Sequence, residues 1–250
     1  MDIIDSHIHL DNTKYKSVEN AVFHASNEIK KSKINKGIIL HLLVQDWSIE
    51  EIAGNISKYD NLEGFINIDP FSNRSKKTLR YAIDDLGYIG LKLHPRLQKF
   101  KPNDPSVLEL VGFAGDLNVP TIIDAFPDGE YLFNGITTNS FFDLAKSCPH
   151  SNIIIAHFGG HHCIDFMMQA KRTDNVFFDF SFSLLYYQNS SVVTDLLYCM
   201  RSMKYDRIFY GSDYPDRGIK ETLEKSLSIF EINNIEKQNI EKLFYSNWEN

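Results

Sequence analysis

Eight short runs of apolar or β-branched residues recur along the chain, and segments of mixed polarity separate them. The runs are residues 3–8, 37–44, 62–68, 88–93, 119–123, 152–156, 176–180 and 207–210. Several of the separating segments have apolar positions at helical spacing, namely residues 17–31, 72–86, 104–117 and 190–203. Continuously apolar strands that alternate with helices are typical of a parallel sheet with both faces covered. Eight such units in 250 residues predict an α/β fold, a single (β/α)8 TIM barrel, with a doubly wound sheet as the alternative.

The chain has no internal boundary that would divide it into two domains. No Pro/Gly/Ser-rich linker or low-complexity tract interrupts it, so residues 1–250 are expected to form one domain. The longest loop-like segment, residues 125–139, follows the fifth predicted strand. In a barrel this segment would lie over the mouth, either as a lid or as a plain surface excursion.

Composition and charge exclude several classes of protein. An apolar content of 43% is enough for a full core, and no run approaches the length of a membrane span. The first residues lack the pattern of a secretory signal, so the protein is expected to be cytoplasmic and not bound to a membrane. A net charge of −7 argues against nucleic acid as a partner. Cys148, Cys163 and Cys199 are widely spaced, which predicts reduced thiols without a disulfide framework or a thiolate zinc site.

Polar side chains gather where five of the eight predicted strands end. His7 and His9 lie two residues apart on the first strand, so both can reach one metal ion or substrate while Ile8 packs away. The other polar strand ends are Lys92 and His94 on the fourth strand, Asp124 on the fifth, His157 on the sixth and Asp213 on the eighth. Because barrel enzymes carry their chemistry at the carboxyl ends of the strands, these residues form a candidate catalytic ring.

Six motifs follow one another at the predicted strands. They are D-S-H-I-H, I-N-I-D-P, G-L-K-L-H-P, I-I-A-H-F-G-G, V-F-F-D-F-S and R-I-F-Y-G-S-D-Y-P. In this order they resemble the amidohydrolase superfamily, specifically the amidohydrolase-related branch that includes aminocarboxymuconate-semialdehyde decarboxylase-like enzymes. The resemblance spans nearly the whole chain, and residues 240–248 are similar to the terminal helix of that family. It implies a single amidohydrolase-like (β/α)8 barrel domain across residues 1–250.

The resemblance also implies a metal site. His7, His9 and Asp213 would hold a divalent metal ion, usually zinc, with His157 beside it as a catalytic or additional ligand group. A bound zinc ion lowers the pKa of its water to about 7. Asp213 would accept the proton of the attacking water, and His157 would stabilise the oxyanion.

One strand end departs from the family pattern. The fifth strand ends in Asp124 where a histidine is usual, so Asp124 occupies the position of a metal ligand. A carboxylate there would favour manganese or magnesium more than the usual site does. The substitution is also compatible with a branch that binds metal weakly or not at all.

Lys92, Arg96 and His94 are the candidate substrate-binding residues. A lysine inside a barrel strand is expected to meet a carboxylate, either that of Asp124 or Asp69 or that of a substrate. Arg96 stands close by in an otherwise acidic protein and offers a two-pronged match to a carboxylate. We therefore expect a small organic substrate that carries a carboxylate group.

Taken together, the residues and the resemblance predict a metal-dependent hydrolase that cleaves an ester, a lactone or an amide. A decarboxylase, which is a lyase, is the main alternative because it would use the same His and Asp groups. A metal-dependent deoxyribonuclease has a similar opening motif, but the acidic net charge and the G-S-D motif count against it. A non-catalytic binding barrel is the remaining alternative, and only Asp124 supports it. The oligomeric state, a homo-oligomer included, stays open.

Overall fold

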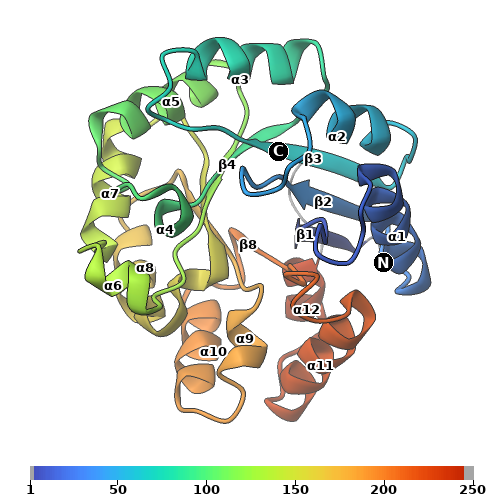
Figure 1. The fold of residues 1–250 in the computed structure, drawn as a ribbon. Coiled ribbons are helices and arrows are strands. Elements are labelled where there is room, and N and C mark those ends of the chain that lie inside the picture. The colour runs from blue at the N-terminus through green and yellow to red at the C-terminus, as the bar shows by residue number, and fades with distance from the viewer. Residues whose placement is uncertain (1–2, 245–250) are drawn as a thin grey trace.

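The computed structural model describes residues 3–244 and contains the eight predicted strands in one parallel sheet (Figure 1). The strands are β1 (Ile4–Ile8), β2 (Lys36–Leu40), β3 (Leu62–Asn67), β4 (Gly90–Leu93), β5 (Thr121–Ile123), β6 (Ile153–Ile155), β7 (Val176–Asp179) and β8 (Ile208–Phe209). Each strand is hydrogen-bonded to the next in chain order. The Ser6 N–H donates to the Tyr210 carbonyl at 2.9 Å and so links β1 to the end of β8. The sheet is thus a nearly closed barrel, which confirms the predicted (β/α)8 fold.

Helices connect the strands and surround the barrel (Figure 1). They are α1 (Val18–Lys31), α2 (Ile49–Ile56), α3 (Ser75–Asp84), α4 (Pro95–Gln98), α5 (Pro105–Asp116), α6 (Gly129–Phe133), α7 (Thr138–Ser147), η1 (Ala156–His162), α8 (Cys163–Ala170), α9 (Ser183–Tyr186), α10 (Val192–Ser202), α11 (Ile219–Ile232) and α12 (Lys237–Phe244). The four segments with helical spacing appear as α1, α3, α5 and α10. Helix α11 packs against α1, so the first and last parts of the described chain lie side by side. Between residues 3 and 244, no helix has the length and apolar character needed to cross a membrane.

The second apolar run is only partly a strand. β2 ends at Leu40, and residues 41–44 form a loop in which Leu43 and Val44 are exposed. The Leu43 N–H donates to Asn67 Oδ1 at 2.9 Å, so a side-chain amide replaces the hydrogen bond of a continuing strand. The predicted extension of this strand to residue 44 is therefore wrong.

The long segment at residues 125–139 contains the short helix α6. The Tyr131 N–H donates to Asp128 Oδ1 at 3.1 Å, which caps the helix. Helix α6 also contacts α4, so the segment is tied to the loop that follows β4. At the other end of the chain, α12 begins at Lys237 and ends at Phe244. Residues 245–248 of the expected terminal helix lie outside the described residues.

The apolar residues form two layers, one inside the barrel and one between the strands and the helices. The inner layer consists of Ile38, Leu40, Phe65, Ile122, Ile154, Ala156 and Phe209. On β4 the two faces separate clearly, because Leu91 and Leu93 join the outer layer whereas Lys92 between them faces the interior. The inner layer gives way to polar groups at the carboxyl ends of the strands, and these groups form the candidate site.

Candidate functional site

His7, His9 and Asp213 bring three potential ligand atoms together at the ends of β1 and β8. His7 Nε2 lies 3.2 Å from His9 Nε2 and 3.3 Å from Asp213 Oδ1, and His9 Nε2 lies 3.6 Å from that oxygen. Ile8 packs into the outer apolar layer, as the alternation of the strand predicts. In a tetrahedral zinc site with bonds of about 2.0–2.2 Å, neighbouring ligand atoms are about 3.3–3.6 Å apart, which agrees with these separations.

The partners of the two imidazoles indicate which ring nitrogen carries the proton. His9 Nδ1 lies 2.9 Å from the Leu40 carbonyl oxygen, and His7 Nδ1 lies 3.0 Å from Asp179 Oδ2. A carbonyl and a carboxylate only accept, so each Nδ1 donates and each Nε2 keeps a lone pair. Two lone pairs and the Asp213 carboxylate therefore converge without a donor among them. A cation satisfies all three atoms, and such Nδ1 partners are typical of metal-bound histidines.

Burial keeps both imidazoles neutral, which is the form that binds a metal ion. Loss of hydration, reinforced by the charge of Lys92, lowers the pKa of His7. Loss of hydration and the neighbouring His7 lower the pKa of His9 well below its usual value. Burial alone would raise the pKa of Asp179, but His7 and His157 hold it low. Asp179 thus stays ionised and accepts a hydrogen bond from His7 Nδ1.

The close approach of β8 to β1 requires a glycine and an unusual backbone. A Cβ atom at Gly211 would lie 2.7 Å from His7 Cβ and 2.8 Å from Ser181 Cβ, so a larger residue would displace them. Asp213 has a φ of 56° and His157 a φ of 59°, in the left-handed region that residues other than glycine rarely adopt. Strained backbone of this kind is concentrated at functional sites.

His157 lies next to the three converging atoms, and its surroundings favour the protonated form. Its Nε2 is 3.2 Å from Asp124 Oδ1, and its Nδ1 is 3.1 Å from the Ser181 carbonyl oxygen. Both partners are acceptors, which favours the imidazolium form with a proton on each nitrogen. Burial opposes the charge, but the hydrogen bond to Asp124 and the charge of Asp213 outweigh it and raise the pKa of His157. The ring centroids of His157 and His7 are 4.8 Å apart.

Asp124 forms a two-pronged ion pair with Arg96. Arg96 Nε donates to Asp124 Oδ2 at 2.9 Å, and Nη2 donates to Oδ1 at 3.1 Å. His94 Nδ1 lies 3.6 Å from Asp124 Oδ2. Burial alone would raise the pKa of Asp124, but His94, His157 and Arg96 hold it well below its usual range. The carboxylate at the expected ligand position is therefore surrounded by cations and donors.

Two groups of potential metal ligands occur within residues 3–244, and both include His7. They are His7, His9 and Asp213, and His7, His157 and Asp179. The second group is held together by hydrogen bonds, because Ser181 Oγ lies 3.2 Å from His7 Nδ1 and 3.0 Å from His157 Nδ1. Asp124 belongs to neither group, and its role as a metal ligand stays a prediction.

The charges of Arg96 and Lys92 differ in how far nearby carboxylates neutralise them. Arg96 also donates to Asp128, the residue that caps α6, so its guanidinium holds two carboxylates. Lys92 is 1% exposed and forms no ion pair with any carboxylate that the structure describes. Burial lowers its pKa, although Asp124 and Asp179 oppose the shift. The role of Lys92 in binding an anionic ligand stays a prediction.

A family model described as Amidohydrolase matches residues 4–247. The chain belongs to the amidohydrolase family. This confirms the resemblance that the six motifs indicate and identifies the protein as an enzyme of this kind. The amidohydrolase contains a His/Asp group with the geometry of a metal site, which supports a divalent metal ion as its cofactor. No curated protein matches the sequence.

Three solved structures illustrate the fold that this amidohydrolase shares. An uncharacterized TIM-barrel protein from Bordetella bronchiseptica is 17% identical with a TM-score of 0.78, covering 100% of this chain and 97% of that chain. A probable 2-pyrone-4,6-dicarboxylic acid hydrolase from Acinetobacter baumannii with citric acid bound is 16% identical with a TM-score of 0.68, covering 98% and 96%. A 5-carboxyvanillate decarboxylase from Novosphingobium aromaticivorans complexed with manganese and 4-hydroxy-3-methoxy-5-nitrobenzoic acid is 12% identical with a TM-score of 0.64, covering 99% and 95%. At these identities the likeness concerns the fold.

Sequence reasoning missed one acidic residue that positions the amidohydrolase site. Asp5 Oδ1 accepts hydrogen bonds from the backbone N–H groups of His7 at 3.2 Å and Ser212 at 2.8 Å, so it fastens β1 to the β8 loop. Burial raises the pKa of Asp5 to about 7 against the effect of these hydrogen bonds. Its only signal in the sequence was its place as the first residue of D-S-H-I-H.

Proposed function

We propose that this amidohydrolase is a metal-dependent hydrolase that cleaves an ester, a lactone or an amide in a small organic acid. The observation that carries the proposal is the convergence of His7 Nε2, His9 Nε2 and Asp213 Oδ1 without a donor among them. These three residues would hold the ion, zinc in the first place and manganese in the second. A divalent ion bound there supplies a water molecule whose pKa is lowered.

The chain's own residues supply the acid–base chemistry of this proposal. Asp213 accepts the proton of the attacking water through its carboxylate, which faces the same point as the two imidazoles. His157 places a positive charge beside that point and stabilises the negative charge that develops on the substrate oxygen. Asp124 and the Ser181 carbonyl hold its two ring N–H groups and so fix its orientation.

The substrate carboxylate is proposed to bind beside Lys92. The charges of Asp124, Asp179 and Asp213 all act on Lys92, and it forms an ion pair with none of the three. His94 is 9% exposed at the end of the same strand and lies next to this point. Arg96 contributes a second hydrogen-bonding group when it exchanges the partly exposed Asp128 for the substrate carboxylate.

A comparison of a substrate acid with its neutral methyl ester tests the carboxylate site. A charge-assisted hydrogen bond contributes about 1.5–3 kcal/mol, so the acid should have a kcat/KM about 10- to 150-fold higher than the methyl ester. Arg96→Ala should raise KM for the acid more than it lowers kcat. Equal kcat/KM values for the acid and the ester would contradict the proposed site.

Decarboxylation is the second candidate reaction. The cationic His157 is buried beside the site and can deliver a proton to carbon as well as stabilise an oxyanion. A decarboxylase that shares the fold was solved with manganese, which agrees with the wider choice of metal proposed here.

Metal analysis and product analysis together test the proposed function. We expect close to one divalent ion per chain, loss of activity with a chelator and recovery with zinc or manganese. Reaction in ¹⁸O-labelled water should place the label in the product acid if the enzyme is a hydrolase. Release of CO₂ without label incorporation would instead identify the lyase, and absence of a stoichiometric metal ion would contradict both.

A further inference from the structure

A groove of about 320 Å³ lies beside the proposed catalytic site, at the carboxyl ends of β2, β3 and β4. Its apolar walls are Leu43 and Val44 from the loop after β2, Phe71 from the loop after β3 and Leu97 from α4. These four side chains are between 46% and 59% exposed. Single exposed apolar residues are common on protein surfaces. Four apolar side chains from three separate segments that line the same groove indicate a binding surface.

The polar residues in the groove are already engaged in holding its walls. Asn67 Oδ1 accepts from Leu43 N at 2.9 Å, and Asn67 Nδ2 donates to the Lys92 carbonyl at 2.8 Å. Gln98 Nε2 donates to the Ile68 carbonyl at 2.7 Å. The two amides are also joined, because Asn67 Nδ2 donates to Gln98 Oε1 at 2.9 Å. The amides therefore fix the three loops relative to one another, and the surface left for a ligand is mainly hydrocarbon.

Residues that line the groove contact the backbone of the strand that carries Lys92 and His94. Asn67 is the register partner of Lys92 in the sheet, and Gln98 Oε1 accepts from the backbone N–H of His94 at 2.8 Å. On the other side, the Leu40 carbonyl that accepts from His9 lies just before the loop that carries Leu43. The groove therefore borders the strand ends at which the substrate head group is proposed to bind.

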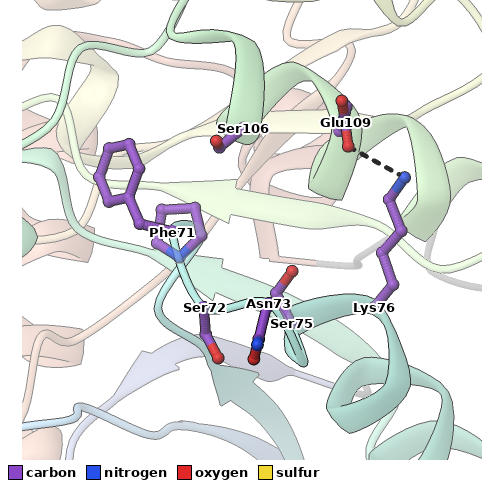
Figure 2. Close-up of a pocket in the computed structure, with 8 residues that line it drawn as sticks. Phe71, Ser72, Asn73, Ser75, Lys76, Ser106 and Glu109 are labelled. Carbon is purple, nitrogen blue, oxygen red and sulfur yellow. Dashed lines mark ion pairs between the residues drawn. The ribbon is translucent and has the colours of Figure 1, made fainter.

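The carboxylate of Asp69 disfavours a second negative charge on a ligand in the groove. Its Oδ1 accepts from the Phe71 N–H at 2.9 Å, and the exposed carboxylate adds a negative charge at the edge of the groove. A second carboxylate on the ligand would lie near this charge. Phe71 also lines an outer polar pocket, which contains an ion pair between Lys76 and Glu109 at 3.2 Å (Figure 2).

We propose that this groove binds an uncharged hydrocarbon end of a substrate whose carboxylate lies at Lys92. The proposal deepens the proposed function and rests on it, since it assigns the head group to the same site. The groove would favour a substrate with one carboxylate on a hydrocarbon chain or ring over a dicarboxylic acid. The size of the groove is typical of a small-molecule subsite.

Equilibrium binding of straight-chain acids tests the groove without requiring turnover. Butanoate, hexanoate, octanoate and octanedioate are titrated into the full chain, supplied with zinc, by isothermal titration calorimetry. Each added methylene should tighten binding about two- to fourfold, as expected for partial to full burial of a CH₂ group. Octanedioate should bind about tenfold more weakly than octanoate, because its second carboxylate would lose hydration next to Asp69. Asp69→Asn should reduce this difference between octanedioate and octanoate.

Variants of exposed residues locate the binding and leave the core intact. Val44→Ser and Leu97→Ser should flatten the dependence on chain length, because each places a hydroxyl on a wall of the groove. Ile232→Ser is the matched control, since Ile232 is an exposed apolar residue on α11 at 76% exposure and does not line the groove. The control should show the same chain-length dependence as the unmodified protein.

The outcomes separate the groove from the proposed function. Three results would overturn the groove proposal. They are equal affinities for butanoate and octanoate, no detectable binding of octanoate, and a dependence on chain length that both groove variants retain. If the protein hydrolyses esters but its affinity for the acids does not depend on chain length, the proposed hydrolase function is supported and the groove proposal is contradicted. Length-dependent binding that the variants lose, in a protein without bound metal or hydrolysis, would support the groove and contradict the hydrolase.

Discussion

Arg96 holds Asp124 through two hydrogen bonds, of 2.9 Å to Oδ2 and 3.1 Å to Oδ1. This ion pair lies where the motif order of the amidohydrolases places a metal-ligating histidine. The guanidinium neutralises the carboxylate, and Asp124 in turn contacts His157 Nε2 at 3.2 Å. Asp124 thus connects Arg96 on α4 with the imidazole of His157 beside the proposed metal ligands.

The ion pair leads to a first prediction, for Asp124→Asn. We expect this variant to keep its zinc and manganese affinities within about threefold, because Arg96 and His157 already occupy the carboxylate. Its kcat should fall by about 10²- to 10⁴-fold, since His157 loses the partner that maintains its charge. Competitive metal binding and single-turnover kinetics measure the two effects. A large loss of metal, or a shift toward zinc in Asp124→His, would instead support Asp124 as a ligand.

A second prediction concerns the paired histidines on β1. His7→Ala combined with His9→Ala should reduce the metal content to below about 0.1 ion per chain, since only Asp213 of the three ligands remains. Elemental analysis of the purified protein measures this content. The single variant His9→Ala should also lose metal, and its side chain at 16% exposure is easier to replace without unfolding than the buried His7.

The control for the histidine variants is His161→Ala. His161 is exposed and contacts the Tyr187 hydroxyl at 3.2 Å, away from the three ligand atoms. This variant should retain full metal content. Normal occupancy in the folded His7/His9 double variant would refute the assigned ligands.

Gly211→Ala provides a third prediction that alters the site without removing a functional group. The added Cβ would meet His7 Cβ at 2.7 Å and Ser181 Cβ at 2.8 Å, so β8 and β1 must move apart. We expect a 10- to 100-fold loss of metal affinity, as for changes to residues that orient ligands, and about 1–3 kcal/mol less stability.

Gly54→Ala is the matched control for this substitution. A Cβ atom at Gly54 in α2 meets no heavy atom within 4 Å. Alanine is the better helix former, so stability should rise by about 0.5–1 kcal/mol while metal affinity stays unchanged. Metal titration and urea unfolding of both variants compare the two positions. An unchanged metal affinity in Gly211→Ala would contradict this prediction, because it would show that the ligands still bind the ion when β1 and β8 lie further apart.

The fourth prediction is a pH dependence that originates at His41. Burial lowers the pKa of His41 to about 4, even though the hydrogen bond with the Asn67 backbone opposes the shift. The unfolded chain takes up a proton below a pH of about 6.5, whereas the folded chain does not until the pH approaches 4. This group therefore makes the free energy of unfolding fall by about 3 kcal/mol as the pH is lowered from 7 to 4.

His41→Asn isolates this contribution, because the asparagine oxygen can still accept from the Asn67 N–H. The difference in unfolding free energy between the variant and the unmodified protein should shift in favour of the variant by about 3 kcal/mol over that pH range. Urea unfolding at several pH values measures it. Parallel pH profiles for the two proteins would mean that His41 titrates normally in the folded state.

The order and direction of the strands follow from local sequence pattern. Each apolar run is short, is bounded by polar residues and alternates with a helical segment, so the eight strands of the parallel barrel could be predicted. The convergence of His7, His9 and Asp213 could be predicted too, because the carboxyl ends of parallel barrel strands meet at one rim. The strand ends predicted a larger ring of polar residues, and the resemblance to the family singled out these three as metal ligands.

Only the tertiary structure decided which groups pair at that rim. The sequence did not indicate that Arg96 pairs with both Asp124 and Asp128, because these two carboxylates come from a later part of the chain. Residues 41–44 have the pattern of a strand, yet Asn67, far along the chain, ends it by accepting the Leu43 N–H. Side-chain directions in loops depend on backbone angles and on partners distant in sequence, whereas strand and helix periodicity is local. The sequence therefore determined the barrel and the residues at its mouth, and the packing of the loops determined which charges remain available to a substrate.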